Sequence, residues 1–191
     1  MATYVVAITG ASGSIYAKTL LYELKNQGHQ IYLVISEAGR QVLATELGWV
    51  LPDSPKQIEE VLKEYLGYEP QSQSLKYFHH TEIGCVIASG SAKNQGMIVI
   101  PCSMSTLSGI AVGRSSNLIE RAADIMLKEG RPLVIVPRET PLNQIHLKNM
   151  LTLAQMGVRI VPAMPAFYNG PESIQDLVNF VVGRAMDGLG I

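Results

Sequence analysis

Two ionisable residues lie side by side in the segment VIVPRETPLNQ, residues 134–144, where a buried strand is expected to end. Arg138 and Glu139 follow the apolar run, and Pro137 and Pro141 restrict the backbone on either side of them. An ordinary turn at this place would need asparagine, glycine or serine instead. Two ionisable groups fixed between prolines therefore indicate a functional site.

The segment ITGASGS, residues 8–14, follows the first apolar run and opens an amphipathic stretch. Its glycines allow backbone N–H groups to approach an anion, and the N-terminus of a helix favours negative charge. Ser12 replaces the second glycine of a dinucleotide fingerprint, and no Gly-Lys-Ser/Thr follows as in a Walker A loop. A mononucleotide or a small phosphate therefore fits better than a dinucleotide or ATP. The alternative is an ordinary strand-to-helix turn with Ser12 or Ser14 as the N-cap.

Hydroxyl groups gather after two further apolar runs. Ser36 follows IYLVI and precedes a helical pattern, where an N-cap serine is the simpler interpretation. In IPCSMSTLSGIAVG, by contrast, Ser103, Ser105 and Thr106 crowd one junction, which is more than capping requires. Backbone N–H groups there could hold an anion or the polar edge of a flavin ring. Cys102 has no charged neighbour in this segment, so we interpret it as a buried structural thiol rather than a nucleophile.

A helix is expected after Asn117, which can cap it, with Glu120 three residues later. Arg121 and Lys128 are seven residues apart and hence lie on one face of that helix. Asp124 can pair with both, because it stands three residues after the first and four before the second. Taken alone, this pattern is typical of a solvated helix face.

The side chains that bind metals elsewhere are dispersed in this chain. His79 and His80 are adjacent, but no second histidine or acidic pair stands at ligand spacing, so we interpret them as surface histidines. Cys85 and Cys102 form no CxxC pair, which indicates free thiols in a reducing compartment. No metal site is therefore expected.

Short β-branched runs alternate with amphipathic stretches along the whole chain. We expect strands at 4–9, 31–36, 97–101, 133–137 and 158–163. Helical patterns occupy 14–27, 37–47, 56–66, 104–112, 118–129, 141–156 and 172–187. Such alternation predicts an α/β fold with a doubly wound, mainly parallel, Rossmann-like sheet in a single domain over residues 1–191. The least regular region, 68–95, is expected to be a long loop at the active site or at an interface.

A parallel sheet binds its ligands outside the carboxyl ends of its strands. Glycines, hydroxyls and charges follow the expected strands, whereas apolar residues make up the strands themselves. The segments concerned are residues 10–13, Ser36, residues 102–106, Arg138 with Glu139, and the segment around Tyr168. We therefore expect these segments to meet at one edge of the sheet.

The composition excludes several classes of protein. Of the 191 residues, 16% are charged, compared with roughly 25% in typical soluble domains, and 47% are apolar. So small a charged fraction indicates that other subunits cover part of the surface. A formal net charge of −1 gives no basic surface for nucleic acid and no polybasic patch for membranes. We recognise no signal peptide and no run of about 18 apolar residues, so we expect a cytoplasmic protein.

Taken together, these segments resemble the UbiX-type flavin prenyltransferases, which belong to a wider group of Rossmann-like flavoproteins. The resemblance covers nearly the whole chain and rests on ITGASGS, VISEAG, PCSMSTLSGIAVG, LIERAADIMLKE, PRETPL, NMLTLAQMGVRIVPAMPAFY and VVGRAMDGLGI in this order. It implies a metal-independent transfer of a dimethylallyl group from dimethylallyl monophosphate to N5 and C6 of reduced FMN. It also implies a homododecamer and the use of the product, prenylated FMN, by UbiD-type decarboxylases.

The resemblance also implies roles for individual residues. The expected flavin-contacting positions are Gly10, Ala11, Ser12, Ser36, Ser103, Met104, Ser105, Thr106 and Arg138. The positions expected to grip the prenyl phosphate are Arg121, Lys128, Tyr168 and Arg184, with Ser12 close by. Glu139 matches the acid/base residue, so Glu139 and Ser12 are the expected catalytic residues. Cations and a phenol around a departing phosphate would stabilise the transition state as a divalent metal does elsewhere.

One departure and two alternatives accompany this resemblance. Some family members carry a tryptophan just before the ASGS segment, whereas this chain reads EIGCVIASGS and has its only tryptophan at Trp49. An FMN-dependent cysteine decarboxylase of the same fold would be expected to show a PASANT-like strand end and a PxMNxxM segment, in place of PCSMST and PAMPAFY. A non-catalytic flavin-binding protein would need neither Glu139 nor the cations expected to grip the phosphate.

Overall fold

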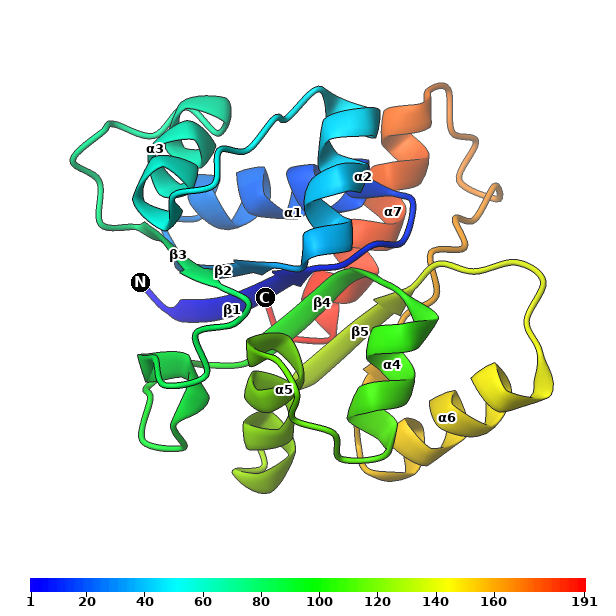
Figure 1. Cartoon of the computed structure of the whole chain (residues 1–191). Coiled ribbons are helices and arrows are strands. Elements are labelled where there is room, and N and C mark those ends of the chain that lie inside the picture. The colour runs from blue at the N-terminus through cyan, green and yellow to red at the C-terminus, as the bar shows by residue number, and fades with distance from the viewer.

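The computed structural model describes all residues, 1–191, and its six strands form one parallel sheet (Figure 1). The strands are β1 (Thr3–Ile8), β2 (Gln30–Ile35), β3 (Leu75–His79), β4 (Met97–Cys102), β5 (Leu133–Pro137) and β6 (Arg159–Ile160). Their order across the sheet is β3-β2-β1-β4-β5-β6, and every neighbouring pair is parallel. This topology confirms the doubly wound α/β fold. One sheet contains every strand, and the single domain over residues 1–191 stays a prediction.

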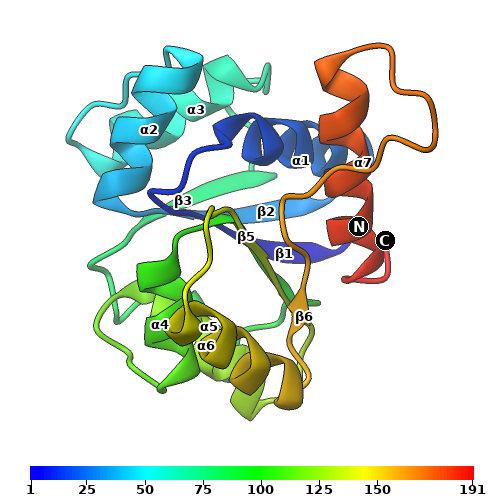
Figure 2. The same ribbon diagram turned by 90° about the vertical axis from the view of Figure 1, so that its right-hand side faces the viewer.

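Seven α-helices cover the two faces of the sheet. They are α1 (Ser14–Asn26), α2 (Glu37–Leu47), α3 (Pro55–Tyr65), α4 (Met104–Ala111), α5 (Leu118–Lys128), α6 (Gln144–Gln155) and α7 (Ile174–Asp187). The first three and α7 lie on one face, and α4, α5 and α6 lie on the other (Figure 1, Figure 2). All the expected helices are present, and the largest difference is at α6, which begins at Gln144, three residues after the predicted start, with the Asn143 side chain as its cap. None of them combines the length and hydropathy that a bilayer crossing requires, and the cytoplasmic location stays a prediction.

Alternate side chains of each central strand enter two separate apolar cores. In β1, Tyr4, Val6 and Ile8 pack toward α1, α3 and α7, whereas Val5 and Ala7 pack toward α4 and α5. Burial on both faces explains why the strands read as continuous apolar runs in the sequence. It also fixes the register of the strands, because a shift by one residue would exchange the two cores. The polar segments at the strand ends are therefore held at fixed positions relative to one another.

The region 68–95 differs from the expected irregular loop, because it contains β3 and a short 3₁₀ turn at Val86–Ala88. β3 lies at the edge of the sheet and pairs only with β2. Its sequence LKYFH includes the exposed Lys76, and so it lacks the uninterrupted apolar run of a central strand. Our criterion of continuous apolar residues therefore found the buried strands and missed the edge strand.

The free edge of β3 is covered by two carboxylates. The backbone N–H of Tyr77 donates to Glu59 at 3.0 Å, and the backbone N–H of His79 donates to Glu82 at 3.2 Å. Lys63, which is also buried, forms an ion pair with Glu59 at 2.9 Å. The edge donors that a neighbouring strand would otherwise use are therefore occupied.

The strand order reverses between β1 and β4, and ligands bind at such a switch point in open α/β sheets. The segment after β1 and the segment after β4 meet at this crevice. At the other side of the sheet, β6 is shorter than the predicted strand at 158–163, since only Arg159 and Ile160 pair with β5. The chain beyond β6 runs along the carboxyl edge of the sheet toward α7 (Figure 2).

Candidate active site

The turn after β1 is shaped by two glycines and starts α1 without a serine cap. Gly13 is the N-cap residue and has a φ of 113°, in the region that favours glycine. Gly10 lies against α2, where an added Cβ atom would stand 2.5 Å from the Cβ of Ala38. The alternative in which Ser12 or Ser14 is the N-cap is therefore wrong, since the helix has no side-chain cap of its own.

A carboxylate from α2 binds at this helix N-terminus instead. Glu46 accepts hydrogen bonds from the backbone N–H groups of Gly13, at 3.0 Å, and Ser14, at 2.7 Å. Partial burial acts to raise the pKa of Glu46, but hydrogen bonds from the Ser12 hydroxyl and these two N–H groups lower it further than burial raises it. The turn thus already binds an anionic oxygen, and so it fits a phosphate group.

Sequence reasoning missed Glu46, although one signal pointed to it. This residue is the second to last of α2, where the negative pole of the helix dipole disfavours a carboxylate. An acid at such a position is stabilised by a partner outside its own helix. The positive N-terminus of α1 is that partner.

One buried hydroxyl joins the turns after β1 and β4. Thr9 is 1% exposed; its Oγ1 donates to the carbonyl of Pro101 at 2.9 Å and accepts from the backbone N–H of Ser103 at 2.7 Å. The Ser103 hydroxyl accepts from the backbone N–H of Thr106 at 3.3 Å and caps α4. These bonds bring together the residues expected to contact a flavin on the two turns, namely Gly10, Ala11, Ser12, Ser103, Met104, Ser105 and Thr106.

Ser36 lies at a third strand end, after β2, and caps α2. Its hydroxyl accepts from the backbone N–H of Gly39 at 3.0 Å, and its own backbone N–H donates to the carbonyl of Ile8 at 2.9 Å. The N-cap interpretation of this serine is therefore confirmed. The proton of a capping hydroxyl can still be donated, so Ser36 can cap the helix and bind a ligand together.

Arg138 and Glu139 follow β5 and do not pair with each other. Arg138 donates from Nε to the carbonyl of Ser12 at 3.2 Å, which joins this segment to the turn after β1. Glu139 is exposed, and its Oε1 accepts from the backbone N–H of Thr140 at 3.0 Å. Neither residue takes part in any ion pair of the structure. The guanidinium is thus held at the first turn, and the carboxylate has no cationic partner.

A cleft of about 260 Å³ adjoins these two residues. Its polar side includes Arg138, Glu139 and Thr140, and its apolar side is formed by Met104, Leu142, Met150, Pro162 and Met164. Methionine side chains adapt to irregular apolar ligands, so the cleft suits a ring or a short branched alkyl group beside a carboxylate. A cleft of about 330 Å³ near Arg131 and Arg159 lies at the amino edge of the sheet and includes none of the expected site residues.

The two α5 residues expected to grip a phosphate lie away from this cleft. Arg121 pairs with Asp124 at 3.4 Å, whereas Lys128 pairs with Glu129 at 3.2 Å, so the expected pairing of Asp124 with Lys128 is wrong. Lys128 ends α5 before β5 begins, and Glu139 follows the end of β5. The length of that strand, roughly 13–17 Å, therefore separates them. One chain alone does not bring Lys128 to the carboxylate.

Tyr168 and Arg184 meet around one aromatic ring on α7. Phe180 makes an edge-to-face contact with Tyr168, with 6.2 Å between the ring centroids, and the Arg184 guanidinium lies 5.5 Å from the Phe180 centroid. Tyr168 is 76% exposed, and Arg184 pairs with Asp187 at 3.1 Å. The structure thus brings these two expected residues together at the surface.

Cys102 lies inside the sheet, as expected for a structural thiol. It is fully buried, and burial raises its pKa, which disfavours the thiolate. The rings of His79 and His80 stand 4.5 Å apart at the end of β3. No three His, Cys, Asp or Glu side chains gather in an arrangement that could hold a metal ion.

Comparison with known proteins shows the family to which this chain belongs. The chain matches the flavoprotein family over residues 2–186. It is 54% identical to the flavin prenyltransferase UbiX of Halalkalibacterium halodurans over 98% of this chain and 88% of the relative. A dodecameric FMN-dependent UbiX-like decarboxylase from Escherichia coli O157:H7 has a TM-score of 0.84 at 40% identity, covering 99% of this chain and 95% of the other. AnUbiX (PadA1), in complex with FMN and dimethylallyl pyrophosphate, has a TM-score of 0.84 at 36% identity, covering 100% and 93%.

A more distant similarity bears on the alternative function. An FMN-dependent cysteine decarboxylase of thioviridamide biosynthesis has a TM-score of 0.63 but only 13% identity, covering 100% of this chain and 99% of the other. This similarity shows a shared fold alone, whereas the UbiX relatives share sequence over nearly the full chain. The chain therefore belongs to the UbiX flavin prenyltransferases of the flavoprotein family.

Proposed function

We propose that this flavin prenyltransferase transfers a dimethylallyl group from dimethylallyl monophosphate to N5 and C6 of reduced FMN. The product, prenylated FMN, would then serve a UbiD-type decarboxylase. One observation carries this proposal: Arg138, the unpaired Glu139 and Met104 of the hydroxyl-rich turn line one cleft, and Arg138 is joined through the Ser12 carbonyl to the turn that binds an anionic oxygen.

The turns after β1, β2 and β4 would hold FMN. Their backbone N–H groups and hydroxyls suit the phosphate, the ribityl chain and the polar edge of the ring. Arg138, which is anchored on the carbonyl of Ser12, would contact the flavin from the side of β5. Reduced FMN supplies a nucleophilic N5 and an aromatic C6, and the methionine-rich side of the cleft would surround the prenyl group next to them.

When the fourth ring closes, C3′ of the prenyl group bonds to C6, C2′ gains a proton as the double bond is lost, and C6 loses a proton. Glu139 would take the proton that leaves C6. Glu139 lines the cleft and forms no ion pair with Arg138. Both facts support the base role over the alternative in which Glu139 only orients Arg138.

Ser12 and Glu46 border the N-terminus of α1, where the departing phosphate could bind. The Glu46 carboxylate accepts hydrogen bonds from the backbone N–H groups of Gly13 and Ser14. An arriving phosphate must therefore displace this carboxylate or share a proton with it, because two adjacent anions repel each other. The Ser12 hydroxyl, which donates to Glu46, could donate to the phosphate oxygens once that carboxylate is displaced.

Neighbouring subunits of a dodecamer would supply the remaining cations. Lys128 is 62% exposed and lies at the opposite edge of the sheet from Glu139. In our proposal, Lys128 of one subunit would therefore act at the site of a neighbouring subunit. Large apolar side chains are exposed on α6, at Ile145, Leu147 and Leu151. Such a helix face favours burial against another subunit.

Anaerobic incubation of the protein with reduced FMN and dimethylallyl monophosphate tests this function. Mass analysis of the flavin should show the added dimethylallyl group only when both substrates and the protein are present. The same reaction with the diphosphate shows which leaving group is used. The flavin product should also activate a UbiD-type decarboxylase that has been prepared without its cofactor.

Two results would contradict the proposal. An unmodified flavin after incubation with the monophosphate and with the diphosphate would exclude prenyl transfer to FMN. Release of carbon dioxide from a peptide with a C-terminal cysteine would identify the decarboxylase alternative instead.

A further inference from the structure

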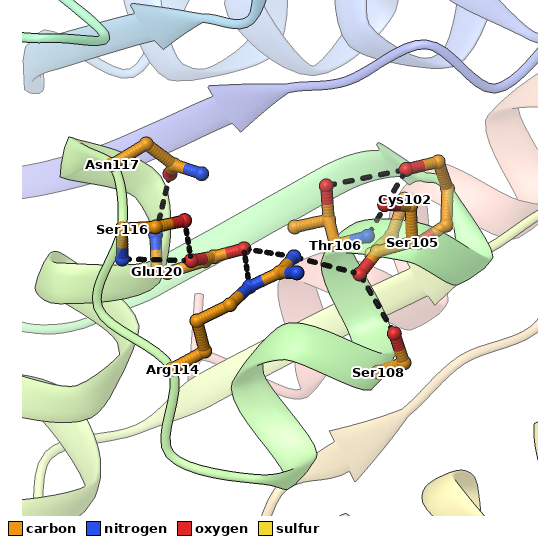
Figure 3. Close-up of polar contacts among 9 residues, drawn as sticks. Cys102, Ser105, Thr106, Ser108, Arg114, Ser116, Asn117 and Glu120 are labelled. Atoms are coloured by element: carbon orange, nitrogen blue, oxygen red, sulfur yellow. Dashed lines mark hydrogen bonds and ion pairs between the residues drawn. The ribbon is translucent and has the colours of Figure 1, made fainter.

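The carboxylate of Glu120 is enclosed between α4 and α5 (Figure 3). Only 1% of its side chain is exposed. Its Oε1 accepts from Nε and Nη2 of Arg114 at 3.0 and 2.6 Å, and its Oε2 accepts from the backbone N–H and the hydroxyl of Ser116 at 3.0 and 2.7 Å. Donors from the loop between the two helices thus satisfy both oxygens. Burial alone would raise the pKa of Glu120, but the hydrogen bonds from Arg114 and Ser116 lower it, so the contact is ionic.

The middle of α4 lies directly against this ion pair. An added Cβ atom at Gly109 would stand 2.5 Å from Oε1 of Glu120 and 2.7 Å from Nη2 of Arg114. The carboxylate could not easily move away, because it is enclosed and fully bonded. The glycine therefore allows α4 to pass close to the ion pair.

The same guanidinium reaches the first turn of α4. Its Nη2 lies 3.5 Å from the carbonyl of Ser105, which also accepts the hydroxyl of Ser108 at 2.9 Å (Figure 3). Ser105 stands between Ser103 and Thr106 in the hydroxyl-rich turn. Arg114 thus contacts the segment that would face the flavin, from the side away from the sheet.

Glu120 also belongs to the first turn of α5, next to a residue expected to grip the prenyl phosphate. Asn117 caps this helix by accepting from the backbone N–H of Glu120 at 3.0 Å, and the backbone N–H of Arg121 donates to the Asn117 carbonyl at 2.9 Å. The first turn of α5, which holds Glu120, therefore also sets the direction in which the Arg121 side chain projects from the helix.

Apolar packing between α4 and α5 does not need this ion pair. Leu107 and Ile110 of α4 share a core with Leu118, Ile119 and Ala122 of α5. Such contacts stabilise the helices but have little directionality. A guanidinium that donates two N–H groups to one carboxylate fixes orientation as well, because its geometry is planar and its hydrogen bonds are short.

We propose that Arg114 and Glu120 form a positioning pair for prenyl transfer, which fixes the flavin-facing first turn of α4 relative to the N-terminus of α5. This inference rests on the proposed function. Neither residue touches a reacting atom. Their role is to hold the hydroxyl-rich turn and Arg121 at the separation that the reaction requires, since a shift of about 1 Å in a bound substrate can slow a reaction about 100-fold.

Variants of the pair separate positioning from stability. Arg114→Ala leaves a buried carboxylate without its cation and should lower both the melting temperature and kcat. Adding Glu120→Gln to that variant removes the unpaired charge, so the double variant should regain most of the lost stability. Its kcat should nevertheless stay about 10- to 100-fold below that of the wild type, because the orienting contact is still missing.

A second measurement does not depend on turnover. Visible circular dichroism of bound, oxidised FMN reports the surroundings of the ring, and the double variant should give an altered spectrum at saturating FMN. Arg131→Ala is the matched control, because that guanidinium also bridges a loop, through the carbonyls of Gly90 and Ala92. It should lower the melting temperature and leave both kcat and the spectrum unchanged.

The outcomes are distinct for the two proposals. A double variant with wild-type kcat and a wild-type FMN spectrum would show that the pair only stabilises the fold, and would overturn the inference. A wild-type protein that never modifies FMN would refute the proposed function, while an altered FMN spectrum in the double variant would still support a positioning pair.

Discussion

Two parts of the proposed site are built in different ways. The flavin turns, which we define as residues 9–13, Ser36 and residues 103–106, are joined to one another by buried or short hydrogen bonds within one chain. The phosphate cations, which we define as Arg121, Lys128 and Arg184, lie at the surface instead: Lys128 and Arg184 are exposed, and Arg121 is partly exposed. Each forms an ion pair with an acid close by in sequence, namely Asp124, Glu129 and Asp187.

The difference shows which part of the site folds with the chain and which part depends on assembly. Hydrogen bonds through buried groups such as Thr9 fix the flavin turns before any ligand arrives. Exposed ion pairs contribute little free energy, so each cation can leave its local acid for a phosphate at small cost. We therefore expect substitutions in the two parts to affect different substrates.

The largest expected effect comes from Glu139→Gln, which keeps the size of the side chain and removes the base. Loss of a general base slows a proton transfer by about 10²–10⁴-fold, so ring closure should slow while bond formation at N5 survives. A flavin joined at N5 alone should accumulate. Because ring closure moves a proton without changing the mass, nuclear magnetic resonance or absorption spectra of the anaerobic flavin must distinguish the two.

The control for this variant is Glu69→Gln, which changes an exposed glutamate remote from the cleft. This control variant should close the fourth ring at the wild-type rate and should accumulate no flavin joined at N5 alone. If Glu139→Gln instead binds FMN weakly and carries all turnover through to the four-ring product, the carboxylate orients Arg138 and is not the base.

Lys128→Gln should weaken the use of the prenyl phosphate and leave FMN affinity unchanged. Loss of a hydrogen bond to a charged group corresponds to roughly 1.5–3 kcal/mol, or about 10- to 150-fold in kcat/KM for the prenyl phosphate. Lys56→Gln, at an exposed position of α3, is the matched control. Equal losses of affinity for FMN and for the prenyl phosphate would remove the distinction between the two parts of the site.

Mixed assemblies sharpen the same comparison. If Lys128 acts in a neighbouring subunit, then refolding Lys128→Gln together with Glu139→Gln should create some sites that contain both native residues. Activity of the mixture should exceed the sum of the two separate preparations. A mixture that never exceeds this sum, in assemblies shown by mass photometry to contain both chains, would mean that each chain supplies its own Lys128.

Thr9→Val tests the flavin turns with a side chain of nearly the same shape. The variant leaves the backbone N–H of Ser103 without its acceptor, which corresponds to about 1–3 kcal/mol for a buried donor. We expect about a tenfold loss of FMN affinity, measured by flavin fluorescence, with little change in KM for the prenyl phosphate. Thr152→Val, which removes a helical hydroxyl on α6, is the control and should leave both constants unchanged.

The smallest expected effect concerns Glu46 and pH. Because its pKa is lowered in the folded protein, its ionised form contributes stability above the unfolded pKa of about 4.3, and this contribution is lost as pH falls through the lower folded value. Glu46→Gln should therefore melt slightly below the wild type at pH 7, because solvent screens an exposed carboxylate and limits its contribution. The two melting temperatures should converge as the pH falls below the lowered pKa of Glu46. A difference that persists in acid would exclude the charge as its cause.

The sequence was most informative where burial and backbone conformation limit the choice of residue. The apolar runs of β1, β2, β4 and β5 predicted the central strands, because both faces of those strands are buried. The edge strand β3 was missed, because one of its sides meets solvent and carboxylates rather than another strand.

The candidate site was predicted less evenly. Motifs at strand ends found the flavin turns, Arg138 and Glu139, because few residue types fit such turns. Glu46 was missed because it reaches the site through a contact between helices; its position in the last turn of α2 indicates a partner outside that helix but does not identify it. Leu142, Met150 and Met164 were missed for a related reason, since single apolar residues in three segments acquire a common role only when the chain folds around the cleft.

The covered edge of β3 also limits how copies of this protein can associate. With Glu59 and Glu82 bound to the outward N–H groups of Tyr77 and His79, a strand from another molecule finds no free donors at these two residues. Growth of the sheet from one molecule into the next, the route to open fibres, is therefore disfavoured at this edge. Association through helix faces remains open to the protein, and contacts of that kind can close into a finite shell with a fixed number of copies.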